Sequence, residues 1–111
     1  MGSEKRLAML EELTRSGQAD SFAWYALANE YASFARIDDA LSAFCSLRQK
    51  DPDYVPQYLI CGTMLVRAGR AAEGREWLEC GISKARAKGD GHAQRELEEA
   101  LELVPPPPSL A

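Results

Sequence analysis

Side chains that commonly carry catalysis or bind metals are few in this chain, and they are widely spaced. The sequence has one histidine, His92, and three cysteines, Cys45, Cys61 and Cys80. The cysteines lack C-x-x-C spacing, so they match neither a zinc site nor a disulfide framework. A single histidine at a helix start also composes no Ser/His/Asp or Cys/His arrangement. We therefore expect no catalytic residue, metal or cofactor, and an enzyme is the most distant alternative.

Composition narrows the classes of partner. The 111 residues are 46% hydrophobic and 27% charged, which is ordinary for one globular domain. The formal net charge of -4 argues against nucleic acid, which needs a clustered basic surface. No apolar run approaches the roughly 20 residues that span a bilayer, and no signal peptide opens the chain. We expect no membrane partner and a cytoplasmic location.

The chain is organised by a pattern that begins at Ser21 and recurs 34 residues later. In the first copy, Trp24, Leu27, Ala28 and Tyr31 share one helical face, and a second apolar stripe follows after a short turn. Large residues recur as large and small residues as small. The paired positions are Trp24 and Tyr58, Leu27 and Cys61, Ala28 and Gly62, Tyr31 and Leu65, Ala35 and Gly69, Ala40 and Gly74, and Phe44 and Leu78.

In the first copy these residues read W-x-x-L-A-x-x-Y, then A-x-x-x-F, then P, which resembles the tetratricopeptide repeat. The second copy reads Y-x-x-C-G-x-x-L, then G-x-x-x-L, and it lacks the closing proline. The resemblance implies an all-α fold, a right-handed superhelical stack of antiparallel helix pairs with about six helices. The small residues would let helices approach closely, with Trp24, Tyr31 and Phe44 filling the gaps.

The same register divides the chain. We expect one domain over residues 1–104, followed by a flexible proline-rich tail over 105–111. Within the domain, the expected parts are a half-repeat helix at 4–16, repeats at 21–54 and 55–88, and a capping helix at 92–104. Gly81, near the middle of a predicted helix, indicates close packing rather than a hinge.

The resemblance also implies a binding surface, because the first helix of each pair lines a concave groove in the family. The predicted groove residues are Phe22, Tyr25, Asn29, Ser33, Leu59, Thr63, Val66 and Arg67. Asn29 matches one residue of the family's carboxylate clamp, but Tyr25 and Ile60 replace its Lys and second Asn. The groove is therefore expected to be mostly apolar, with a few polar points.

Three occupants of such a groove remain open. The first is a peptide or helix of a partner protein, which would make the chain an adaptor or scaffold. The second is another copy of the chain, giving a homodimer or larger assembly. The third is the chain's own terminal helix or proline tail. A basic strip at Lys84, Arg86 and Lys88 and the prolines at 105–108 are weaker candidates for docking sites.

Overall fold

Helices form the framework of the protein, whose computed structural model describes residues 3–106. Within that range there is no strand, so the predicted all-α fold is confirmed. The six helices are α1 (Glu4–Arg15), α2 (Ser21–Ser33), α3 (Ile37–Lys50), α4 (Pro56–Arg67), α5 (Ala71–Lys88) and α6 (Gly91–Glu102). Residues 1–2 and most of the tail predicted over 105–111, namely 107–111, lie outside the described range.

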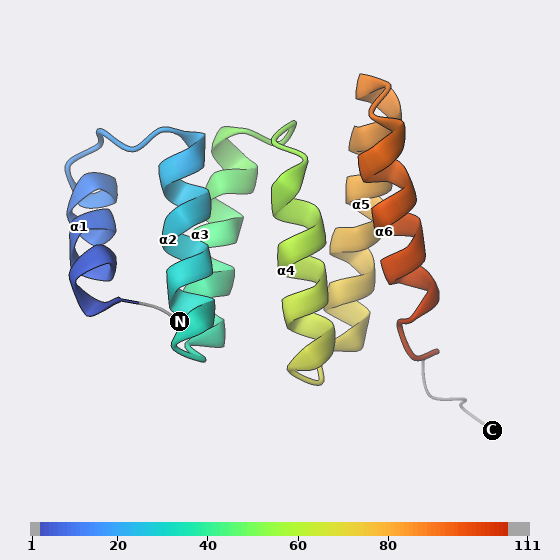
Figure 1. Ribbon diagram of the computed structural model, residues 1–111, viewed down its shortest axis with the longest axis horizontal. Coiled ribbons are helices and arrows are strands. Elements are labelled where there is room, and N and C mark those ends of the chain that lie inside the picture. The colour runs from blue at the N-terminus through green and yellow to red at the C-terminus, as the bar shows by residue number, and fades with distance from the viewer. Residues whose placement is uncertain (1–2, 107–111) are drawn as a thin grey trace. The chain divides into compact units, whose positions relative to one another are not determined.

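The chain divides after Tyr54 into two compact units, each with three helices in which successive helices run antiparallel (Figure 1). The expected single domain over 1–104 remains a prediction. The first unit packs α2 against α1 and α3. Its core is built at the small and large positions of the repeat, with Ala28, Ala40 and Phe44 all fully buried. Small residues on α2 and α3 thus let the two helices approach around one aromatic ring.

A buried carboxylate, which no pattern in the sequence predicts, joins α1 to α2. Glu30 is only 7% exposed, and it accepts hydrogen bonds from the Ser3 N–H (3.0 Å) and the Arg6 guanidinium (2.8 Å). The Ser3 N–H, assisted by Arg6 and opposed by burial, holds the pKa of Glu30 below its ordinary value of 4.5. A second link is the Tyr31 hydroxyl, which donates to Glu11 at 2.7 Å. Burial and this carboxylate raise the pKa of Tyr31 to about 12.

In the second unit, glycines bring α4, α5 and α6 together. A β-carbon added to Gly62 would lie 2.7 Å from Leu78, and one added to Gly81 would lie 2.5 Å from the β-carbon of Tyr58. Those separations are shorter than any ordinary contact, so only glycine fits where α5 crosses α4. Leu97 of α6 also packs over Gly81. The interpretation of Gly81 as a close-packing position is therefore confirmed.

Local sequence sets the helix ends. Pro56 is the first residue of α4, where its missing N–H costs nothing. Asp20 and Asp90 cap α2 and α6 by accepting from backbone N–H groups three residues on. Gly69 adopts a left-handed φ of 82° in the turn between α4 and α5. Ala35 holds the matching position of the first unit at φ 59°, a conformation that L-residues avoid.

Candidate functional site

The four predicted groove residues of the first unit all lie on α2. Phe22 is the most exposed large apolar side chain among the described residues of that unit, at 65%. Tyr25 is half-buried, because its ring packs 5.5 Å from that of Tyr54 and 6.5 Å from those of Phe22 and Phe44. Tyr25 therefore contributes to packing within the unit as well as to its surface.

The two polar members of this set differ in what they offer a ligand. Asn29 is half-buried on α2, and Ser33 is the last residue of the same helix. The Ser33 hydroxyl donates to the Glu30 carbonyl at 2.7 Å, so it is already engaged by its own helix. On α2, the surface offered to a partner is consequently dominated by Phe22.

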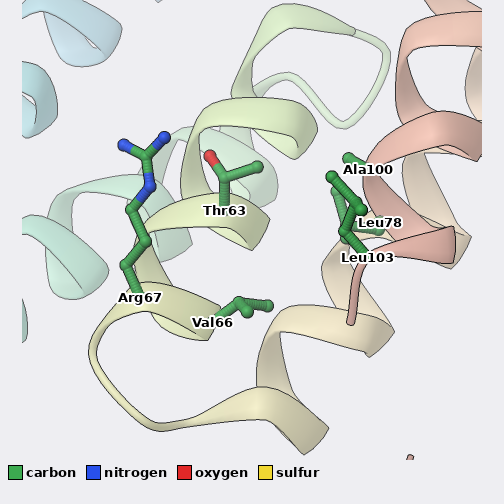
Figure 2. Close-up of a pocket in the computed structure, with 6 residues that line it drawn as sticks. All are labelled: Thr63, Val66, Arg67, Leu78, Ala100 and Leu103. Carbon is green, nitrogen blue, oxygen red and sulfur yellow. The ribbon is translucent and has the colours of Figure 1, made fainter. Parts of the chain in front are cut away.

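On α4, the sequence-predicted residues help to form a pocket. Thr63, Val66 and Arg67 line it, whereas Leu59 is half-buried elsewhere on the helix. The remaining lining residues come from α5, from α6 and from the residue that follows α6 (Figure 2). The complete lining, called the α4–α6 pocket from this point, is Thr63, Val66, Arg67, Leu78, Ala100 and Leu103, enclosing about 150 Å³.

The glycines of the helix crossing position the inner wall of this pocket. Leu78 is fully buried and lies directly against Gly62, while the Val66 side chain lies against Gly74. Any larger residue at either glycine would push Leu78 or Val66 away from its present place. The small positions of the repeat thereby fix the position of the wall formed by Val66 and Leu78.

The pocket is apolar apart from one charge. The Thr63 hydroxyl donates to the carbonyl of Leu59 at 2.8 Å, which leaves its methyl group to face the cavity (Figure 2). Leu103 follows α6 and is 83% exposed. Arg67 is the only charged lining residue, and Figure 2 shows it on the α4 side beside Thr63.

Sequence reasoning misses half of this lining. The repeat register assigns Leu78 only to packing. Ala100 belongs to the apolar stripe expected for the capping helix, which is Leu97, Ala100, Leu101 and Val104. Leu103 lies outside that stripe, so the pattern does not single it out. The packing of α6 against both α4 and α5 brings these residues to the pocket. Leu103 stands close to other apolar residues, Leu101 and Val104, so its place in the sequence gives no separate signal.

A second cavity lies in the first unit, between α1 and α3 over α2. It has a volume of about 240 Å³, is open to solvent, and is lined in part by Trp24 and Tyr31. Both rings are half-buried and leave this space open beside them. Lys50 lies 5.6 Å from the Trp24 ring centre and Arg36 lies 4.7 Å from that of Tyr31. The lining residues are Thr14, Trp24, Leu27, Tyr31, Asp39, Ser42, Ala43 and Ser46.

Neither unit offers a cluster for metal binding within the described range. No group of three or more His, Cys, Asp or Glu side chains in residues 3–106 is placed to hold an ion. Cys45 is exposed, Cys61 is buried and Cys80 is half-buried, while His92 is exposed and pairs with Glu96 when protonated. In the same range, each helix is too short or too polar to cross a bilayer.

Solved structures resemble this arrangement closely. A crystal structure of a tetratricopeptide repeat domain protein from Salinibacter ruber has a TM-score of 0.70 at 32% identity, covering 78% of this chain and 96% of that one. A solution structure of such a protein from the same organism gives 0.72 and 33%, covering 77% and 86%. The protein BPP2914 from Bordetella parapertussis gives 0.77 at 25% identity, covering 94% and 89%.

Sequence comparison alone is less informative, since neither family models nor curated proteins give a match. Antiparallel helices packed in two compact units define the chain as a helical-repeat protein. Together with solved relatives at 32–33% identity, this shows that the chain belongs to the tetratricopeptide repeat family. Membership supports a protein-interaction module as the general class of function, a class that is typically non-enzymatic.

Proposed function

We propose that this protein is an adaptor or scaffold that binds a peptide or helix of a partner protein through the α4–α6 pocket. The observation that carries the proposal is the pocket itself, an apolar cavity of about 150 Å³ bordered by an exposed leucine. A dry apolar cavity of about this volume is enough to hold a benzene ring. One large apolar side chain of the partner would therefore occupy it.

The other predicted groove residues have a supporting role in this proposal. Leu59, on α4 of the same unit, would contact a further residue of the partner segment, whereas Phe22, Tyr25, Asn29 and Ser33 of α2 are kept as a separate candidate contact surface of the first unit. Phe22 is the strongest of these, because its ring is already mostly exposed. The cytoplasmic location expected from the sequence stays a prediction.

The test uses a phage-displayed library of random short peptides, selected on the intact protein. We expect the selected peptides to share one large apolar residue. Ala100→Phe should weaken their binding about tenfold or more, since it fills the pocket and burial of one such side chain contributes about 1.5–3 kcal/mol. Ala87→Phe, on an exposed part of α5, is the matched control.

A second pair of variants guards against misfolding of Ala100→Phe. Leu103→Asp removes the exposed wall of the pocket, and Met9→Asp changes a similarly exposed side chain (59%) on α1. Circular dichroism should report unchanged helicity for both. Peptides that bind equally well to Ala100→Phe and Leu103→Asp as to wild type would refute the pocket as the binding site.

The exposed Phe22 and Leu103 also favour a second candidate function, which is self-association. Another copy of the chain would then cover these side chains, and the protein would serve as a subunit of an assembly. Light scattering separates the two candidates. A dimer in wild type that dissociates in Phe22→Glu or Leu103→Asp supports self-association, whereas a monomer in wild type excludes it at the concentration used.

A further inference from the structure

The α4–α6 pocket has an uneven charge distribution that restricts its partner. Its only charged lining residue is Arg67, at the end of α4. Among the described residues Arg67 makes no ion pair, whereas Arg70, in the turn that follows, is paired with Glu73 at 2.7 Å. Arg67 is exposed, and its guanidinium lies at the rim, on the side of Thr63 away from Leu78, Ala100 and Leu103 (Figure 2), where an incoming group can reach it.

Two carboxylates lie on α6 beside the pocket, outside its lining, and one of them, Glu96, also faces His92 at 3.3 Å. Glu96, Glu99 and Leu103 are separated by three and four residues, so they share one face at the end of the chain's last helix. Glu99 is exposed and its carboxylate has no ion pair among the described residues. An acidic group in the pocket's mouth would be attracted toward α4 and repelled from α6, which gives the bound segment a preferred orientation.

The charge of the whole molecule limits how acidic the partner is. With a formal net charge of -4, the protein repels a run of carboxylates at long range. A single acid in contact with Arg67 escapes most of this repulsion. Carboxylates farther away than the Debye length of about 8 Å are screened by physiological salt, whereas the contact with Arg67 is not. A basic residue on the other side of the anchor would match the carboxylates of α6.

We infer that the partner segment carries a large apolar residue flanked by an acidic side chain, which pairs with Arg67, and by a basic side chain over the Glu96 and Glu99 face of α6. The inference rests on the proposed function and adds the chemistry of the ligand. It specifies a segment of mixed charge and one binding direction. Neither a purely apolar nor a polyacidic segment fits these walls equally well.

An alternative explanation for Arg67 needs no partner. It lies in the last turn of α4, where any cation is stabilised by the helix dipole. Stabilisation by the helix dipole does not depend on the ligand, and a lysine at this position would receive it equally. The experiment must therefore measure ligand preference rather than the stability of the protein.

The same phage library tests the inference when selection is repeated on Arg67→Glu. We expect wild-type peptides to carry Asp or Glu close to the anchor, and Arg67→Glu to select Lys or Arg there instead. A synthetic wild-type peptide should lose about two- to fivefold in affinity when its acid becomes an amide, as for a solvent-exposed ion pair. On Arg67→Gln the same change should have no effect, while Arg67→Lys should behave like wild type.

The outcomes separate the inference from the proposed function. Peptides that need the apolar anchor and are lost in Ala100→Phe, yet show no acidic preference or the same sequences on Arg67→Glu, would overturn the inference alone. Peptides that are indifferent to Ala100→Phe and Leu103→Asp would refute the pocket, and with it both proposals. Selection of polyacidic peptides would also contradict the inference, because it predicts a basic residue opposite α6.

Discussion

Substitution of Gly74 by alanine tests whether close helix packing builds the pocket. A β-carbon at this position would lie 2.7 Å from the carbonyl oxygen of Gly62 and 2.6 Å from a methyl group of Val66. Ordinary contacts begin near 3.4 Å, so α4 and α5 must separate by about 0.7 Å, the difference between 3.4 and 2.7 Å. The atom that resists is a backbone oxygen, which cannot rotate away.

The expected magnitude follows from two opposing effects. Overpacking a core costs about 1–3 kcal/mol, and alanine regains about 1 kcal/mol of helix propensity over glycine. Because backbone rather than a flexible side chain is displaced, the cost falls in the upper half of its range. Gly74→Ala should therefore lower the free energy of unfolding by about 1–2 kcal/mol.

Gly91 provides the matched control for this measurement. It begins α6, and an added β-carbon would meet only the end of the Arg95 side chain at 3.6 Å. Gly91→Ala should be neutral or stabilise by up to about 1 kcal/mol, through the unfolded chain. Urea unfolding followed by circular dichroism measures both variants. If Gly74→Ala proves as stable as Gly91→Ala, the glycine crossing is not tightly packed and does not position the pocket wall.

Two further predictions concern the turn residues with left-handed φ and the buried carboxylate of Glu30. Ala35→Gly should stabilise the protein by about 0.5–1 kcal/mol, because it relieves a left-handed φ. Gly69→Ala should destabilise it by about 1–2 kcal/mol. Changes of the same sign in the free energy of unfolding, measured with urea, would contradict this prediction. The pKa of Glu30 is lower in the folded than in the unfolded chain, so its stabilisation is present above about pH 4.5 and is lost as the pH falls through the folded value. Glu30→Gln should thus be less stable than wild type at neutral pH, and its free energy of unfolding should fall less as the pH is lowered. An unchanged fall at acid pH would exclude Glu30 as the source of that pH dependence.

Local patterns are enough to predict the helices and their close packing. The 34-residue recurrence places Gly62 and Gly74 at positions that are small in both copies, and each lies where a β-carbon would collide. Gly69 lies just after the end of α4 and Pro56 is its first residue, which are the positions that these residue types favour. These features depend on residues that are near in sequence, so a single chain is sufficient to reveal them.

The parts that sequence reasoning misses depend on contacts between different helices. Glu30 looks like an ordinary surface residue until the start of α1 is seen to supply two hydrogen bonds to it. Likewise, Leu103 belongs to a pocket only because α6 packs beside α4. Tyr25 has the register of a groove residue, but the ring of Tyr54 shields part of it. None of these pairings has a periodic signature.

The packing of each helix against its neighbours in sequence has a kinetic consequence. Within each unit, the helices that touch are consecutive or separated by one other helix. Folding a unit therefore closes only short loops, which keeps the entropy lost before native contacts form small. Helical proteins with such local contacts fold in microseconds to milliseconds, and repeat arrays can nucleate in any unit. A chain assembled in this way exposes its apolar faces only briefly during synthesis.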